Sequence, residues 1–257
     1  MTKKVLLIFS VFLLAANFLF AQEKAMDPEA AKLYNQGNKF VKSGQFQGAL
    51  ENYEAALKIQ KHPNIYYQKS VVYKKMRNFD QAVESYKKCL ELDPKFIIAY
   101  NGLGTTYYSL ERFEDAIANF EKYIELNKDK KQNKTTEKYI SYAYTKLGQS
   151  AQRDGKFELA VQMLKKAVAN YDYDAAYLSL AEVNIALGSY DDALAAADKA
   201  INTRTASSSI SKGAPYYYKG LAFKGKTDIA KAKENFLISL KDNQYKANSQ
   251  YELNQLK

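Results

Sequence analysis

The sequence predicts an all-α solenoid of about six helix–turn–helix repeats, and three observations support this fold class. First, an aromatic or aliphatic residue followed three positions later by alanine recurs six times in the 257 residues. Second, the intervals between these alanines are 33, 34, 44, 33 and 39 residues, close to one constant period. Third, no segment shows the alternating polarity of a half-buried strand. A fixed period of roughly 20–50 residues indicates stacked helical units, each of which buries its apolar face only against its neighbours.

Each repeat combines a motif alanine with a second small residue further upstream. Small residues let paired helices approach closely, and large residues on the next turn fill the remaining space. Two insertions, of about ten and about five residues, account for the two long intervals. The motifs open at Phe46, Phe79, Phe113, Phe157, Tyr190 and Ile229, their alanines are Ala49, Ala82, Ala116, Ala160, Ala193 and Ala232, and the upstream small residues are Gly37, Ser70, Gly104, Gly148, Ala181 and Gly220.

This pattern resembles the tetratricopeptide-repeat (TPR) family over residues 30–242, and the unit from Ala99 to Leu126 matches it best. The resemblance implies a right-handed superhelix. We expect units 1–3 over 30–130 and units 4–6 over 141–242, followed by a capping helix over 243–257. The charged segment 131–140 is expected to be a linker or insertion; the stretch 128–138 forms either a solvated loop or an extended helix end. The Ser/Thr-rich insertion 203–213 is expected to be a solvated loop.

The first 21 residues have the pattern of a secretory signal. Lys3 and Lys4 precede a long apolar run, and Ala21 ends that run before polar residues begin. A basic start, an apolar core and a small residue at the boundary are typical of such signals. We therefore expect an exported protein, periplasmic in a bacterial cell envelope, with an uncleaved membrane anchor as the alternative.

Composition excludes several kinds of site. With one cysteine, Cys89, the chain forms no intramolecular disulfide, and with one histidine, His62, it has no histidine-clustered zinc site. We expect His62 to be a solvated turn residue, and no metal or cofactor is expected. The net charge is +10, and the basic bias falls mainly on residues 131–257. Because an exported chain seldom meets nucleic acid, acidic protein segments or an anionic envelope surface are the better candidate partners.

Residues 220–227 match the phosphate-binding loop pattern G-x-x-x-x-G-K-[ST]. A nucleotide-binding enzyme is therefore the alternative function. The pattern works when a buried strand delivers glycine-rich backbone to the phosphates at a helix start. Here the preceding residues fall on the first helix of a repeat, with Gly220 at the small-residue position. We therefore predict that this match is not a nucleotide site and that the protein is not an enzyme.

The TPR resemblance implies a binding surface on the first helices of the repeats, which line the concave groove in that family and hold extended peptides or partner helices. Tyrosines, amides and cations at these positions suit a polar peptide. Acidic residues are scarce among them, which favours a partner segment that is itself acidic. The predicted peptide-binding residues are Tyr34, Asn38, Tyr67, Lys74, Asn101, Thr105, Tyr108, Tyr142, Gln149 and Arg153, and further groove positions are Lys42, Lys75, Glu182, Tyr217 and Lys224.

Some TPR proteins hold a C-terminal carboxylate with a lysine-and-asparagine clamp. Here Asn38 matches one clamp position, but Tyr34 replaces the lysine, and Ile98 and Gly102 replace two further cations. The resemblance to the clamp subclass therefore fails. We expect Tyr67 and Tyr108 to point away from the helix-pair contacts, so that both are free to contact a partner. The predicted function is a non-catalytic interaction scaffold, with assembly or secretion complexes of the envelope as candidate partners. Peripheral association with a membrane or an envelope complex stays open.

Overall fold

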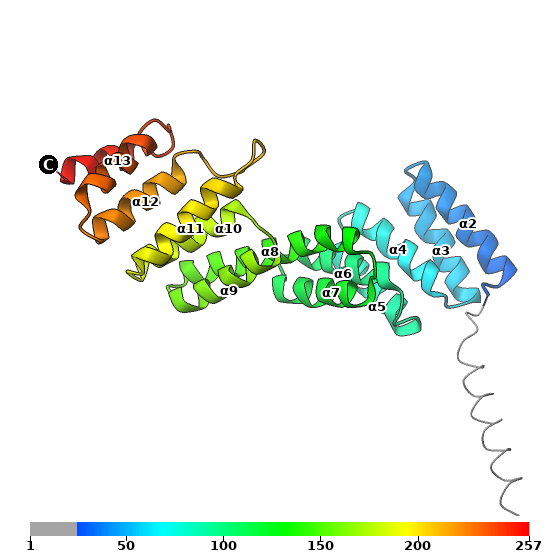
Figure 1. Cartoon of the computed structure of the whole chain (residues 1–257). Coiled ribbons are helices and arrows are strands. Elements are labelled where there is room, and N and C mark those ends of the chain that lie inside the picture. Colours follow the sequence, from blue (N-terminus) through cyan, green and yellow to red (C-terminus); the bar gives the residue numbers. More distant parts are fainter. Residues whose placement is uncertain (1–24, 257) are drawn as a thin grey trace, which may run out of the picture.

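The computed structural model describes residues 25–256, so the predicted signal segment 1–21 lies outside the described residues. Within this range the chain forms helices only, arranged as consecutive antiparallel pairs along an elongated array (Figure 1). The predicted fold class is confirmed. The six pairs are α2 (Pro28–Lys42) with α3 (Phe46–Ile59), α4 (Pro63–Lys75) with α5 (Phe79–Leu92), α6 (Ile97–Ser109) with α7 (Phe113–Leu126), α8 (Lys130–Arg153) with α9 (Phe157–Asn170), α10 (Asp174–Ala186) with α11 (Tyr190–Thr203), and α12 (Ala214–Gly225) with α13 (Ile229–Ser239), followed by α14 (Lys246–Gln255).

The second helix of every pair begins at the residue that opens the sequence motif. The motif alanine in its first turn is fully buried in all six repeats. In five repeats a large or medium side chain of the second helix faces the upstream small residue, sixteen positions earlier in the sequence. A Cβ added to Gly104 would lie 2.6 Å from the Phe120 ring, and one added to Gly220 would lie 2.5 Å from Phe236. The helices of a pair can therefore approach closely only because these positions carry small residues.

Every turn between paired helices contains one residue with left-handed backbone conformation. Three of these residues are glycines, which adopt this conformation readily. The other three, Arg77, Glu111 and Thr227, have φ of 62°, 58° and 61° although each carries a Cβ. Left-handed backbone brings the Cβ of an L-residue too close to the following carbonyl oxygen and costs roughly 1–2 kcal/mol. The spacing between these turn residues equals the spacing between the motif alanines. Both insertions therefore lie outside the helix turns.

The charged segment at 131–140 is not a linker but the first part of α8, which is 24 residues long. Of the two alternatives for 128–138, the extended helix end is the one observed. Asp129 caps the helix by accepting hydrogen bonds from the backbone N–H groups of Lys131 and Gln132. Asn133, which is buried, exchanges hydrogen bonds of 2.9 and 3.1 Å with Asn127. These hydrogen bonds hold the first turns of α8 in place, although this part of the helix has no apolar face.

The second insertion forms the loop between α11 and α12, as expected, but internal and long-range hydrogen bonds hold it. Arg204 donates to the Ile210 carbonyl oxygen, and Ser208 donates to Asp174. The N–H of Gly213 donates to Asp242 at 2.8 Å, beyond the end of α13. The loop is therefore attached to the repeats on both sides and is not merely solvated chain.

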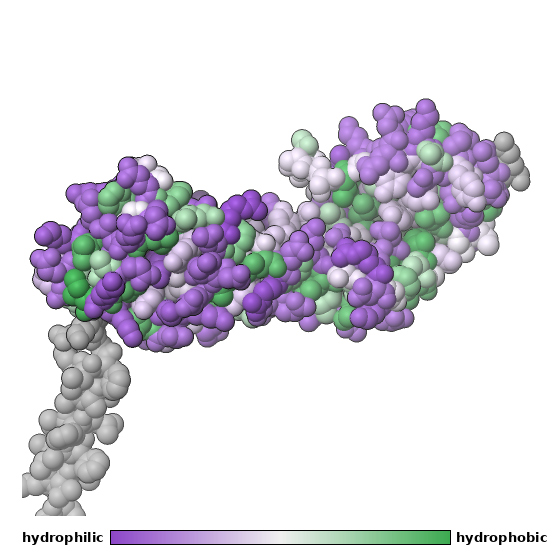
Figure 2. All heavy atoms as spheres, turned by 180° about the vertical axis from the view of Figure 1, so that it is seen from behind, coloured by the Kyte–Doolittle hydropathy of each residue, from purple (hydrophilic) through white to green (hydrophobic). Residues whose placement is uncertain are grey.

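The array ends in α14, which packs on α13 within the segment predicted to cap it. The buried Glu252 of α14 forms an ion pair with Lys224 of α12, with 2.6 Å between the ammonium nitrogen and a carboxylate oxygen. Seen from behind, the surface is mostly hydrophilic with scattered hydrophobic residues, and its outline dips between the two halves of the array (Figure 2). None of the helices in residues 25–256 combines the length and apolar character needed to cross a bilayer.

Candidate functional site

The first helices of the repeats lie on the inner side of the curved array. Neighbouring first helices contact one another, as α2 does with α4 and α8 does with α10, whereas within residues 25–256 second helices make no comparable contacts with each other. A stack of helix pairs curves toward the side on which its helices are closer together. The predicted groove residues from Tyr34 to Arg153 all lie on these first helices, α2, α4, α6 and α8.

At the N-terminal end, two of the predicted groove residues, Asn38 and Tyr34, contact a core residue of the fold. Asn38 accepts a 2.6 Å hydrogen bond from the hydroxyl of Tyr53, a buried residue of α3. The ring of Tyr34 also lies against Tyr53, with centroids 6.0 Å apart. Asn38 therefore keeps only its amide N–H groups for a partner.

Tyr67 and Tyr108 do not point away from the helix contacts, contrary to expectation. The Tyr67 ring lies 5.2 Å from Phe96 and 6.0 Å from Tyr86, which places it between two repeats. Tyr108 packs 5.4 Å from Phe113 of the paired helix. Burial raises the pKa of both phenols. Both rings are half-buried and pack against aromatic residues of the paired second helices.

Lys74 and Thr105 meet across two repeats. The Lys74 ammonium donates a hydrogen bond to the Thr105 hydroxyl, which in turn donates to backbone carbonyls of α6. Burial lowers the pKa of Lys74, so its charge is held in a partly desolvated position. This pair links α4 to α6 and gives the groove a positive charge near Asn101, which is half-buried on α6.

The first helices α6 and α8 contact each other less than the neighbouring pairs of first helices do. Tyrosine rings lie here: Tyr108 lies 6.0 Å from Tyr139, and Tyr142 lies 4.6 Å from Tyr173. A pocket of about 270 Å³ opens here, lined by Tyr108, Tyr142, Thr145, Lys146, Gln149 and Tyr173. Three predicted site residues, Tyr108, Tyr142 and Gln149, therefore converge on one hollow.

Sequence reasoning missed Tyr173, Lys146 and Thr145 in this pocket. Tyr173 precedes α10 as its capping residue, so a count of positions along helices does not include it. Lys146 and Thr145 lie on α8 beside predicted residues; Lys146 is exposed, whereas Thr145 belongs to the buried face of the helix. Gln149 donates a 3.0 Å hydrogen bond to Ser179 of α10 and so connects the pocket to the fifth repeat.

The remaining groove positions form no single site with this pocket. Arg153 is exposed at the C-terminal end of α8. Further along, Lys224 is paired with Glu252, and Tyr217 packs 5.2 Å from Tyr245 near the capping helix. These C-terminal side chains secure the last helix and are less available to a partner.

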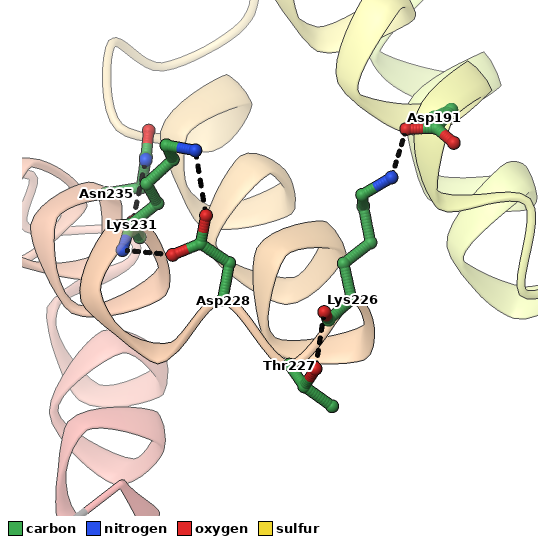
Figure 3. A network of polar contacts seen from close by, with 6 residues as sticks. All are labelled: Asp191, Lys226, Thr227, Asp228, Lys231 and Asn235. Carbon is green, nitrogen blue, oxygen red and sulfur yellow. Dashed lines mark hydrogen bonds and ion pairs between the residues drawn. The ribbon is translucent and has the colours of Figure 1, made fainter.

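The phosphate-loop pattern does not form a phosphate site. Residues 220–225 are the last part of α12, and Lys226 caps its C-terminus, where carbonyl groups rather than N–H groups point outward (Figure 3). A Cβ on Gly225 would lie 2.2 Å from the Tyr190 ring. Lys226 forms an ion pair with Asp191, and Thr227 donates to the Lys226 carbonyl oxygen. The glycines serve helix packing, and the lysine links two repeats.

A hollow of about 510 Å³ lies between α7, the C-terminal part of α8 and α9. Its walls include Glu114, Ile117, Ala118 and Glu121 of α7. A similar hollow of about 480 Å³ lies between α3, the end of α4 and the turn that follows α4, and its α3 wall uses the equivalent positions Gln47, Leu50, Glu51 and Glu54. Because the hollow recurs at equivalent positions in two repeats, it follows from the way in which one repeat packs on the next and marks no particular site.

No group of three or more potential metal ligands occurs among residues 25–256. His62 is not a solvated turn residue as expected but is buried at the start of α4, where its Nδ1 accepts a hydrogen bond from the Asn64 N–H at 3.2 Å. Its imidazole therefore serves as a helix cap.

Three family models, each described as a tetratricopeptide repeat, match residues 63–96, 97–130 and 145–209. Together they cover more than half of the chain; the first two matches coincide with the pairs α4–α5 and α6–α7, and the third begins within α8 and ends after α11. The chain belongs to the tetratricopeptide-repeat family. None of the three models describes a catalytic family.

Curated relatives include the human DnaJ homolog subfamily C member 7, 31% identical over 99 residues, which are 37% of this chain and 20% of that protein. The small glutamine-rich tetratricopeptide repeat-containing protein 2 of Mycosarcoma maydis is 26% identical over 38% of this chain and 28% of its own length. The match thus spans less than a third of these relatives. Among solved structures, a MamA protein is similar over 72% of this chain and 94% of its own, at 27% identity and a TM-score of 0.49.

Local packing leaves no room for a cationic side chain at Gly102. A Cβ at this position would lie 2.4 Å from the Tyr86 ring and 2.6 Å from its hydroxyl oxygen. Any side chain, including the cation expected in the clamp subclass, would collide with a residue of the core. The first three repeats therefore use this space for packing.

Proposed function

We propose that this TPR protein is a non-catalytic scaffold that binds a peptide segment or partner helix in its concave groove. The observation that carries the proposal is the convergence of Tyr108, Tyr142 and Gln149 on one open pocket that is lined by α6, α8 and the residue before α10. Rigid phenol rings give contact area at little entropic cost, and the amide can bond a peptide backbone. A relative from Arabidopsis thaliana, 26% identical over 40% of this chain and 19% of its own length, is named Hsp70-Hsp90 organizing protein 2, which supports a protein partner.

The proposed setting is the bacterial cell envelope, with an assembly or secretion complex as the partner. The supporting observation is the signal pattern of residues 1–21. Export predicts that the mature protein begins at Gln22 in a periplasmic fraction. N-terminal sequencing that finds Met1 or Thr2 on membrane-bound protein would instead favour an uncleaved anchor. The basic bias of residues 131–257 makes an acidic partner or peripheral contact with an anionic envelope surface the preferred association.

Affinity capture with a groove variant tests the scaffold proposal. The variant combines Asn101→Ala, Tyr142→Ala and Gln149→Ala, and circular dichroism checks that it folds. We expect it to reduce capture of the partner at least tenfold, because aromatic anchors commonly contribute about 2 kcal/mol or more. The matched control combines Lys87→Ala with Lys122→Ala on second helices and should leave capture unchanged. If only the control variant lost capture of the partner, the binding surface would lie on the outer face and not in the groove.

A further inference from the structure

The pocket between α6 and α8 presents hydrogen-bond donors and no carboxylate. Its lining consists of three tyrosines, one threonine, one glutamine and one lysine. The Thr145 hydroxyl already donates to the Ser141 carbonyl oxygen at 2.7 Å, and the Gln149 amide donates one of its N–H groups to Ser179. The phenols and Lys146 are therefore the main donors open to a charged ligand group, and Gln149 keeps one N–H and its oxygen. Lys146 is exposed and forms no ion pair with any residue from 25 to 256.

Two of the phenols lie beside polar side chains of neighbouring segments. The Lys138 ammonium lies 5.6 Å from the centroid of the Tyr142 ring, and Ser209 lines the adjoining hollow together with Tyr173. Burial raises the pKa of Tyr173, so this phenol keeps its proton at neutral pH. Tyr108 forms no hydrogen bond through its hydroxyl in the described part of the chain, and its proton is free as well.

Two carboxylates close to the pocket already accept hydrogen bonds from other residues. Asp172 and Asp174 lie in the adjoining hollow, on the other side of the Tyr142–Tyr173 ring pair. Asp172 accepts a 2.7 Å hydrogen bond from Tyr177, and Asp174 accepts from Ser208 and from the Ala175 N–H. Neither carboxylate lines the donor pocket, so no side chain of the described residues neutralises Lys146 there.

We propose that the pocket of Tyr108, Tyr142, Lys146 and Tyr173 binds the carboxylate of an aspartate or glutamate side chain within an extended segment of the partner. This inference rests on the proposed function, because it specifies which chemical group the groove recognises. Convergent phenol and ammonium donors satisfy the acceptor-only oxygens of a carboxylate. The pocket lies in the middle of the array, with groove on both sides, so a chain can pass through it and present an internal side chain.

The test uses 12-residue peptides selected for binding to the purified protein, synthesised with an acetylated N-terminus and an amidated C-terminus. Each selected peptide is compared with a version in which one acid is replaced by its amide, Glu→Gln or Asp→Asn. Calorimetry measures the affinity of both for the wild type and for a triple variant, Tyr108→Phe, Tyr142→Phe and Tyr173→Phe. Phenylalanine keeps every ring contact and removes only the hydroxyl groups. The matched control is Tyr251→Phe, a largely exposed tyrosine on α14.

For the wild type and the control, we expect replacement of one particular acid to weaken binding about tenfold or more, as for hydrogen bonds to a charged group. The triple variant keeps Lys146, so it should retain a preference for the acidic peptide, but a clearly smaller one than the wild type has. Peptides that bind in the groove with no preference for an acid, or with a preference that is undiminished in the triple variant, would overturn this inference alone. So would binding that requires a free C-terminal carboxylate. If no peptide binds, or if binding survives Asn101→Ala with Gln149→Ala, the groove proposal fails and this inference fails with it.

Discussion

Replacing Gly104 by alanine should stabilise α6 through the higher helix propensity of alanine but destabilise its packing against α7. The structure predicts that the packing cost is the larger of the two effects. Alanine in a helix interior is favoured over glycine by about 1 kcal/mol. At position 104, however, the new Cβ would lie 2.6 Å from two ring carbons of Phe120, about 1 Å inside normal contact. Phe120 is fully buried and stacked 5.7 Å from Tyr139, so its ring cannot retreat freely.

Overpacking of this kind typically costs about 1–3 kcal/mol. Subtracting the propensity gain, we expect Gly104→Ala to lower the free energy of unfolding by about 1 kcal/mol, or Tm by roughly 2–4 °C for a chain of this size. Thermal unfolding followed by circular dichroism measures the change. Gly48→Ala is the matched control, because its Cβ would lie 3.3 Å from the edge of the half-buried Phe40, and it should be neutral or slightly stabilising.

A double variant tests whether the cost arises from this contact. In the fifth repeat, Ala181 and Ala197 occupy the two equivalent positions, and both are fully buried. Two small residues are therefore compatible there. Phe120→Ala alone should cost about 3–5 kcal/mol. Combined with Gly104→Ala, it should cost less than the sum of the single changes, with a coupling of about 0.5–3 kcal/mol. A stabilising Gly104→Ala, or strict additivity, would refute this reasoning.

Three further changes test other parts of the structure. Thr227→Gly should raise the free energy of unfolding by up to about 1 kcal/mol, because glycine adopts the left-handed conformation without strain. Gly188→Ala, at the equivalent turn, should lower the free energy of unfolding. Chemical denaturation of both variants measures the two changes. The Gly213 N–H holds the pKa of Asp242 below its ordinary value, so the stability from this contact is present at neutral pH and is lost as pH falls through the lowered pKa. Asp242→Asn should therefore flatten the acid side of the Tm profile; an unchanged profile would argue against the contact. Ala160→Leu should cost about 1–3 kcal/mol in thermal unfolding, since this fully buried residue faces a helix-pair contact, and an unchanged Tm would contradict the register.

Much of the fold could be predicted because the repeat carries its information in small residues and aromatic residues at fixed spacing. Phe113 and Ala116 set where α7 begins and which side of it is buried, and the structure follows both. The left-handed turns at Arg77 and Glu111 could not be predicted, because the sequence lacks the glycine that normally indicates such a turn. Tertiary packing of the helices imposes the conformation there.

The start of α8 could not be predicted for a different reason. Asn133 and Thr136 occupy buried positions, so the helix has no apolar period in its first turns. The same insertion lengthens α8, the helix that contributes most of the donor pocket. Sequence reasoning placed Tyr108 and Tyr142 on the groove, but it could not show that Tyr173, at the start of another helix, completes their pocket.

Site-specific photo-crosslinking tests most directly whether the concave face is the binding surface. Benzoylphenylalanine replaces Asn101 or Gln149 on the first helices, or Lys87 or Lys165 on exposed positions of second helices. After irradiation in cells, crosslinked partners are identified by mass spectrometry. The groove account predicts that one partner is captured from Asn101 and Gln149 and is absent from the other two positions. Capture of that partner from Lys87 or Lys165, with none from the groove, would contradict it.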